Sequence, residues 1–464
     1  MTDAWIVGGS LRDELLGRPV RDVDVAVAGD PARAAQALAE QVRGPVFRLS
    51  EAFGAWRVID RRAERVYDFA PLQGETIESD LRKRDFTINA MSRAIELDAL
   101  GATGGEAVGG EAALLIDPLG GRADLDSRTL RVLGPEAYAS DPLRTLRLAR
   151  FAAELGFAPD PETERLTQAA APRVTDAAGE RVFGELRRLL IADGALAGLE
   201  LTDRLGVLDA VMPELTALHG VDQSDYHHLD VYDHTLEVLG QQIEVETRLD
   251  ELFGADATRL RGVLAEPLGD ELTRGEALRF GALVHDIGKP ATRDVRADGR
   301  ITFMGHDALG ERMVHALCRR LRTSERFARF LAGLTRHHLV LGFLVHERPL
   351  DRAQVYRYLR RTAPVEVEVT LLSCADRLAT RGRRADEATA VHLELAAALM
   401  TAALDWREHG PPRVPVRGDE LADELGIEPG PELGRLLGEL EEAAYVGAAG
   451  TREQAIALAR RLRA

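Results

Sequence analysis

Two short stretches near the N-terminus, GGSLRD at residues 8–13 and DVD at residues 22–24, decide how the first part of the chain folds. The apolar segment 4–7 predicts a strand that ends at the glycine pair, and residues 11–16 predict a helix after it. Residues 23–27 alternate in polarity like a second strand, so Asp22 and Asp24 should leave it on one face. Paired carboxylates suit Mg²⁺, and a Gly-Gly turn before a helix presents N–H groups to phosphate. Taken alone, the two aspartates are also compatible with a solvated strand face, and the Gly-Gly pair is compatible with an ordinary turn.

Strand and helix signals alternate over about the first 130 residues. Residues 31–42 predict a helix, residues 56–60 with 65–69 predict a hairpin, and the glycine-rich residues 101–110 predict a loop. From Asp141 onward the apolar period is almost wholly helical, and it is interrupted by the prolines at 411–412. The sequence therefore predicts an α/β head followed by helical domains.

Bulk composition limits the possible classes of protein. The chain has 464 residues, more than one ordinary domain, and its two cysteines, Cys318 and Cys374, cannot form a disulfide framework or a four-cysteine zinc site. The sequence contains no run of about 18 apolar residues, so no membrane span is expected. The first predicted strand begins too near the N-terminus to leave room for a signal peptide. A cytoplasmic enzyme is the expectation. The net charge of −17 argues against a surface built uniformly for nucleic acid, although arginines gather at 319–336 and acids at 244–276.

Four further motifs follow the first one in order. They are RDFTINA at residues 84–90, DP…GG…DL at 117–125, DPLRTLR at 141–147 and GDEL…PGPELG at 418–434. The five together resemble the polymerase-β-like nucleotidyltransferase superfamily and, within it, the class II tRNA nucleotidyltransferases and bacterial poly(A) polymerases. The resemblance implies template-independent transfer of CMP and AMP from CTP and ATP to the 3′ end of tRNA, that is, CCA addition or repair. Poly(A) polymerases and CC-only or A-only enzymes share these motifs and stay open as alternatives.

The resemblance also implies the roles of individual residues. Asp22 and Asp24 would hold Mg²⁺ in a two-metal arrangement, with Asp68 as candidate for a third catalytic carboxylate or, equally, a strand-edge acid. The expected nucleotide-binding residues are Gly8, Gly9, Arg12, Arg84, Asp85, Asn89, Asp141, Arg144 and Arg147.

Asp141 and Arg144 form the expected base-reading pair. Three residues apart on a helix, they face the same side. A carboxylate accepts from the amine shared by adenine and cytosine, and a guanidinium donates to a ring acceptor. The local alternative is Asp141 as a helix cap with Pro142 in the first turn. Ser140 stands where the family usually has an acid, which leaves fine nucleotide selectivity open.

A second constellation lies in the helical part. His234, the pair at 285–286 (His285 and Asp286) and Asp376 occur in an order that resembles the HD phosphohydrolase superfamily. A lone histidine is usually structural, but four ligands in this order predict a nitrogen and oxygen metal site. The metal would be Mn²⁺, Ni²⁺, Fe²⁺ or a similar ion, or Mg²⁺. His306 and His337 are expected to support a second metal or bind phosphate.

The resulting prediction has four parts and a defined set of partners. The parts are a nucleotidyltransferase head at 1–130, a helical neck with the base-recognition motif at 131–218, an HD domain at 219–385 and a helical tail at 386–464. The expected partners are the tRNA 3′ end, ATP and CTP. No association with a membrane is expected, and no protein partner can be predicted. A phosphohydrolase activity of the HD domain is implied. An HD phosphohydrolase whose N-terminal half merely binds nucleotide is the alternative from another class.

Overall fold

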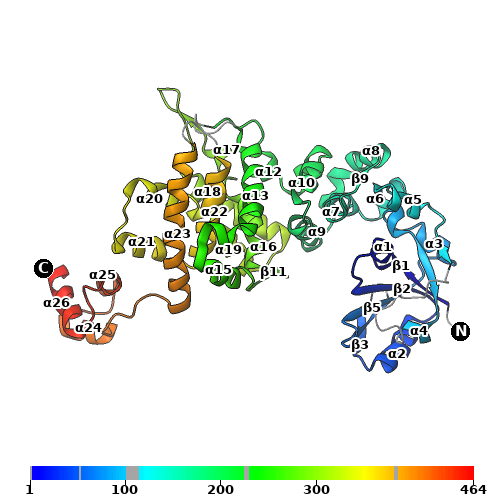
Figure 1. Ribbon diagram of the computed structural model, residues 1–464, viewed down its shortest axis with the longest axis horizontal. Coiled ribbons are helices and arrows are strands. Elements are labelled where there is room, and N and C mark those ends of the chain that lie inside the picture. The colour runs from blue at the N-terminus through cyan, green and yellow to red at the C-terminus, as the bar shows by residue number, and fades with distance from the viewer. Residues whose placement is uncertain (1–2, 52–53, 101–113, 224–228, 381–384, 464) are drawn as a thin grey trace. The chain divides into compact units, whose positions relative to one another are not determined.

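The computed structural model describes residues 3–51, 54–100, 114–223, 229–380 and 385–463 (Figure 1). It forms two compact units, Met1–Val211 and Met212–Ala464. The predicted α/β head followed by helical domains is confirmed. The predicted loop at 101–110 lies outside the described residues. The four-part division of the chain stays a prediction.

The head is built on one mixed sheet. Its strands are β1 (Asp3–Val7), β2 (Asp22–Ala28), β3 (Val46–Ser50), β4 (Ala55–Asp60), β5 (Arg65–Pro71), β6 (Ser92–Ile95) and β7 (Leu115–Ile116). They lie in the order β3-β4-β5-β2-β1-β6-β7, and only β2 and β5 pair in parallel. This parallel pair sets Asp24 opposite Asp68, which brings the predicted carboxylates onto neighbouring strands.

Short helices cover and connect the sheet. They are α1 (Gly9–Leu15), α2 (Pro31–Val42), α3 (Ile77–Leu81), the 3₁₀ turn η1 (Thr87–Asn89), α4 (Leu97–Leu100) and α5 (Gly121–Asp126). Helix α2 starts where Asp30 accepts a hydrogen bond from the Ala32 N–H, with Pro31 in the first turn. Its buried face packs on β4 and β5.

The rest of the first unit is helical. It comprises β8 (Thr129–Leu130), α6 (Pro135–Ser140), α7 (Arg144–Leu155), β9 (Ala158–Pro159), α8 (Pro161–Ala170), η2 (Ala171–Asp176), α9 (Gly179–Ile191), α10 (Ala195–Arg204) and α11 (Val207–Val211). Helix α7 packs against α9 and α10. Gly198 permits the close approach of α10, because a Cβ there would stand 2.9 Å from the Ala153 Cβ. Helices α7, α9 and α10 therefore form one closely packed group.

The second unit is almost wholly helical. Its main part comprises α12 (Pro213–Thr216), α13 (Val231–Thr247), α14 (Leu249–Phe253), η3 (Gly254–Asp256), α15 (Ala257–Leu264), β10 (Pro267–Gly269), β11 (Leu272–Thr273), α16 (Arg274–Val284), α17 (Lys289–Thr292), β12 (Asp294–Val295), β13 (Ile301–Thr302), α18 (His306–Leu321), α19 (Glu325–His337), α20 (Val340–Leu344), η4 (Val345–Glu347), α21 (Arg352–Thr362), α22 (Glu366–Ala379) and α23 (Ala385–His409). Helix α22 is its centre: residues 366–375 are all buried, and it packs against α13, α16 and α23.

The last three helices form a small core of their own. They are α24 (Gly418–Leu425), α25 (Pro431–Val446) and α26 (Arg452–Arg463). Leu421, Leu436, Leu440 and Ala455 lie at its centre.

Within the described residues, one helix, α23, is long and apolar enough to cross a membrane by length and composition alone. Its Ala396, Leu399, Met400 and Ala403 are buried within the unit. A core helix of a soluble protein passes the same test.

Candidate active site and metal centres

The glycine turn at the end of β1 forms one wall of the first site. Gly8 has φ 71° and ψ −138°, a conformation that is essentially restricted to glycine. Ser10 closes the turn: its Oγ donates to the Val7 carbonyl at 2.9 Å and accepts from the Asp24 N–H at 3.3 Å. A Cβ on Gly8 would stand 2.8 Å from an Arg84 guanidinium nitrogen. The turn is therefore fixed against β2, and it leaves room for Arg84.

Three carboxylates meet beside this turn. Asp22 and Asp24 are exposed on one face of β2, and Asp68 lies beside Asp24 on β5. Arg57 binds Asp68 through two hydrogen bonds, at 2.7 and 2.6 Å. Although Asp24 reaches the cavity, surrounding protein desolvates it and raises its pKa to about 6; Arg84 opposes this shift, whereas Asp68 and Asp22 add to it.

The carboxylates fit a divalent metal ion. In the described part of the chain, no cation or hydroxyl group engages the side chains of Asp22 and Asp24 directly, so their oxygens can act as ligands. Mutual repulsion between neighbouring carboxylates is relieved when a cation binds between them. Asp68 is already occupied by Arg57, which makes it a weaker candidate for a ligand.

A cavity of about 570 Å³ surrounds this cluster. Its lining includes the predicted residues Gly8, Gly9, Arg12, Asp22, Asp24, Arg84, Asp85, Asn89 and Arg147. Residues outside the motifs also line it, among them Arg150, Phe151, Glu185 and Arg188 from the neck. The structure thus brings together residues from three of the five motifs, and the neck supplies one wall.

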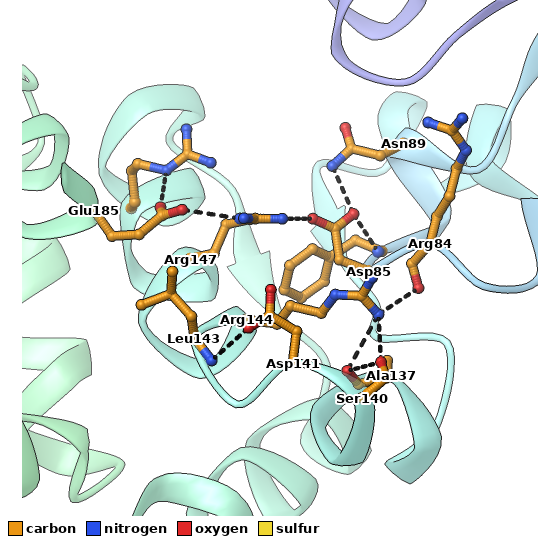
Figure 2. A network of polar contacts seen from close by, with 12 residues as sticks. Arg84, Asp85, Asn89, Ala137, Ser140, Asp141, Leu143, Arg144, Arg147 and Glu185 are labelled. Carbon is orange, nitrogen blue, oxygen red and sulfur yellow. Dashed lines mark hydrogen bonds and ion pairs between the residues drawn. The ribbon is translucent and has the colours of Figure 1, made fainter. Parts of the chain in front are cut away.

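Hydrogen bonds tie this wall to the head (Figure 2). Arg147 donates from Nε to Glu185 at 3.0 Å and from a terminal nitrogen to Asp85 at 3.0 Å. Asp85 also accepts from the Asn89 amide at 2.9 Å. Burial opposes ionisation of Asp85, but Arg147 and the amide outweigh it and lower the pKa of this carboxyl.

Asp141 and Arg144 line a second cavity, of about 670 Å³. Arg84 lines both cavities, so they adjoin at this residue. Asp141 accepts from the Leu143 N–H at 3.3 Å and from Arg181 at 2.8 Å. The predicted helical placement and capping role of Asp141 are wrong: it follows α6 with an extended backbone, and α7 begins at Arg144 after Leu143 as N-cap, without a side-chain cap. Arg181, on α9, was not indicated by any motif.

Arg144 is held by the main chain rather than by a carboxylate. One terminal nitrogen donates to the Lys83 carbonyl at 3.1 Å. The other donates to the Arg84 carbonyl at 3.2 Å, and to Ala137 and Ser140 (Figure 2). Its Nε is buried and has no hydrogen-bond partner within the described residues. Burial lowers the pKa of Arg144. Arg144 is thereby fixed in the wall of this cavity.

The second unit gathers two buried triads of metal-ligand type. The triads are His234, His285 and Asp376, and Asp286, His306 and His338. Each of His285, His306 and His338 places Nδ1 2.7–2.8 Å from a main-chain carbonyl. Since a carbonyl only accepts, Nδ1 carries the proton and Nε2 has its lone pair free for a metal.

Asp286 is the centre of this arrangement. Its carboxylate lies 3.0 Å from the His285 Nε2, 3.3 Å from the His306 Nε2 and 2.6 Å from Lys289 Nζ. Burial would raise its pKa, but His285 and Lys289 hold it well below the usual range. An Asp286 oxygen and the His285 Nε2 are buried without a hydrogen-bond donor or acceptor among the described residues. Such orphaned atoms in a buried His and Asp cluster fit divalent metal ions.

The structure corrects one of the predicted residues. His338, and not His337, points its Nε2 at His306 (3.3 Å) and Asp286 (3.6 Å). Adjacent helical residues point about 100° apart, so only one of the two can face the site. His337 lies instead near Arg361 and Arg336; desolvation, strengthened by these cations, lowers its pKa to about 4.

Comparisons with known proteins find similar sequences along nearly the whole chain. Family models match at residues 4–131 (Poly A polymerase head domain), 156–218 (Probable RNA and SrmB-binding site of polymerase A) and 231–381 (HD domain). The A-adding tRNA nucleotidyltransferase of Deinococcus radiodurans is 35% identical over 99% of this chain and 95% of its own length. The CC-adding tRNA nucleotidyltransferase of Thermus thermophilus is 34% identical over 98% and 92%.

Solved structures show the same fold. A CCA-adding enzyme in complex with ATP matches with a TM-score of 0.64 at 19% identity, over 100% of this chain and 92% of that one. A Thermotoga maritima CCA-adding enzyme in complex with tRNA matches with a TM-score of 0.58 at 20% identity, over the same shares. These likenesses confirm the fold expected from the motifs.

Proposed function

The chain belongs to the tRNA nucleotidyltransferase family, whose head is the poly(A) polymerase head domain, and we propose that it transfers CMP and AMP from CTP and ATP to the 3′ end of tRNA. The observation that carries the proposal is the pair of adjoining cavities. One holds the exposed carboxylates and the glycine turn, and the other holds Asp141 and Arg144. A nucleoside triphosphate that spans Arg84 would place its phosphates in the first cavity and its base in the second.

Asp22 and Asp24 would hold Mg²⁺, which neutralises the pyrophosphate and favours ionisation of the tRNA 3′-hydroxyl. Gly8 and Gly9 bring main chain close to the triphosphate, and Arg12 balances its charge. Arg57 holds Asp68 beside them as a fixed anion. The head therefore positions the reacting groups without reading a template.

Base selection would reside in the second cavity. The Asp141 carboxylate can accept from the amine of adenine or cytosine while Arg181 holds it in place. The Arg144 guanidinium, which lines the cavity, can donate to a ring nitrogen. Guanine and uracil present a carbonyl at the position of the amine, and Asp141 would repel it.

Partial-tail synthesis is the second candidate. The two relatives matched over nearly the whole chain are named A-adding and CC-adding, and Ser140 replaces the acid that the family pattern usually has. The same cavities would then serve a single base.

The test uses three tRNA transcripts, which end before CCA, after C and after CC. Each is incubated with Mg²⁺ and with CTP and ATP singly and together, and products are resolved at single-nucleotide length. Growth by C, C and A that then stops supports the main proposal. Addition of only C or only A supports the second candidate, and unlimited addition of A marks a poly(A) polymerase. No addition by the wild-type protein would refute nucleotidyl transfer.

The HD cluster supports an additional activity, the metal-dependent hydrolysis of phosphate esters. Its two triads lie around a buried Asp286, and they offer imidazole and carboxylate ligands of the kind that Mn²⁺, Ni²⁺, Fe²⁺ or Mg²⁺ accepts. Hydrolysis of 2′,3′-cyclic AMP and of p-nitrophenyl phosphate, measured with each ion, tests this proposal. Equal rates for wild type and Asp286→Asn would contradict it.

A further inference from the structure

Asp80 is a buried carboxylate beside Arg84, the residue at which the two cavities adjoin. It lies on α3, its side chain is 4% exposed, and it is not one of the described residues that line either cavity. One of its oxygens accepts from the main-chain N–H of Gln73 at 2.9 Å. The other accepts twice from Arg84, from Nε at 3.2 Å and from one terminal nitrogen at 3.0 Å. Both oxygens of Asp80 are therefore committed inside the protein.

The paired contact with Asp80 leaves one end of the Arg84 guanidinium for the cavity. This second terminal nitrogen lies toward the glycine turn, where a Cβ on Gly8 would stand 2.8 Å from it and 3.4 Å from an Asp24 oxygen. The main-chain carbonyl of Arg84 accepts from Arg144 at 3.2 Å (Figure 2). Arg84 is thus held at its main chain and at two guanidinium nitrogens, and the third faces the carboxylate cavity.

The same aspartate closes residues 73–84 into a compact segment. It binds Gln73 near one end of the segment and Arg84 at the other. Lys83 also donates from Nζ to the Gln73 carbonyl. Gln73 and Lys83 line the second cavity, so this wall depends on the same closed segment. The ends of the segment can separate only if the contacts of Asp80 break.

We propose that Asp80 is a positioning residue that clamps the Arg84 guanidinium so that its third nitrogen meets the phosphates of the nucleotide beside Asp24. The proposal rests on the proposed function, in which the triphosphate occupies the first cavity. A guanidinium that is already held at two donors loses little further freedom when the third binds a phosphate oxygen, whereas a loose arginine must be ordered first. Asp80 therefore acts on the nucleotide only through Arg84.

Binding of inorganic tripolyphosphate with Mg²⁺, measured by calorimetry, tests the proposal because this ligand contains the phosphates without base or ribose. Asp80→Asn keeps the shape of the side chain and removes the charged acceptor of Arg84. We expect its dissociation constant to rise about tenfold, as for loss of one hydrogen bond between charged groups. Glu14→Gln is the matched control. Glu14 pairs with Arg93 in the head, and neither is one of the described residues that line a cavity, so this variant should match wild type.

A double-mutant cycle separates positioning from a purely structural effect. Arg84→Met has no guanidinium to hold, so adding Asp80→Asn to it should not weaken the binding of tripolyphosphate further. The double variant also leaves no buried carboxylate unpaired, and it should unfold at a higher temperature than Arg84→Met. A residue that only supported the fold would weaken binding in both backgrounds.

Arg84→Lys provides a second test that keeps Asp80 paired and does not depend on the folding of Asp80→Asn. Lysine has one ammonium group in place of a fork, so an ammonium bound to Asp80 cannot also reach the cavity. We expect Arg84→Lys to bind tripolyphosphate about tenfold more weakly than wild type, although the net charge is unchanged. Wild-type affinity of Arg84→Lys would overturn the clamp.

An unchanged dissociation constant in folded Asp80→Asn overturns the proposal, as does an equal effect of Glu14→Gln. Effects of Asp80→Asn and Arg84→Met that multiply would also overturn it, because they would show that the two residues act independently. Nucleotide addition by the wild-type protein is measured in parallel. If the wild type adds nucleotides while these criteria fail, the positioning role alone is refuted. If the wild type adds none, the proposed function is refuted, and the calorimetry still decides whether Asp80 positions Arg84.

Discussion

Replacing Gly8 by alanine should reduce both stability and catalysis, for two separate reasons. The backbone there has φ 71° and ψ −138°, and an L residue in such a conformation costs on the order of 1–3 kcal/mol. The added Cβ would also stand 2.8 Å from an Arg84 nitrogen and 3.4 Å from an Asp24 oxygen. The Arg84 side chain must move, and Asp24 then loses the cation that most stabilises its charge. We expect kcat/KM to fall by about tenfold to a hundredfold, as for loss of a charged contact.

Gly17→Ala is the matched control. Gly17 also has a positive φ, 67°, but no atom lies within 4 Å of its added Cβ. Its cost is confined to the backbone, about 1–2 kcal/mol. Thermal unfolding and single-turnover nucleotide addition are measured for both variants. Both should unfold earlier than wild type, and only Gly8→Ala should lose activity. Equal kcat/KM in the two variants would refute the role of the close approach between Gly8 and Arg84.

Three other predictions follow from the sites. Because the pKa of Asp24 is raised to about 6, a proton must leave before metal binds, and the apparent Mg²⁺ affinity should fall about tenfold per pH unit below 6; a flat Mg²⁺ titration between pH 5 and 7 would contradict this. His338→Ala should lower the metal content of purified protein, measured by elemental analysis, whereas His337→Ala should not; the reverse order would contradict the cluster. Asp141→Asn, whose amide can also donate, should raise misincorporation from UTP or GTP about tenfold relative to ATP; unchanged selectivity would remove Asp141 from base reading.

Local signals predicted the strands and helices that frame the first site. Strands β1, β2, β4 and β5 and helix α2 appear where the apolar patterns placed them, because each buries a regular face. The sequence patterns did not predict the edge strand β3. Its middle residues, Phe47, Arg48 and Leu49, are all exposed, so buried and exposed positions do not alternate along it. Short strands such as β7 (Leu115–Ile116) have too few residues to show an alternation of polar and apolar side chains, so they could not be predicted.

The sequence indicated many of the residues that line the sites, but not the residues that contact them through tertiary packing. Motif order pointed to Asp22, Asp24 and Arg147, but it contained nothing about Glu185 or Arg181, which reach the sites from α9 through tertiary packing. Adjacent histidines at 337–338 could not be told apart without the phase of the preceding helix. Ligand sets that converge from separate helices depend on packing that a linear pattern does not record.

Nucleotide addition by Asp24→Asn tests the central claim most directly. The variant keeps the shape of the side chain and removes one charge of the carboxylate cluster, and Asp126→Asn, at an exposed ion pair of the head, is the control. With a tRNA transcript lacking its 3′ end, the account predicts that the single-turnover rate of Asp24→Asn falls about a thousandfold or more while Asp126→Asn matches wild type. An Asp24→Asn rate within about threefold of wild type would contradict it.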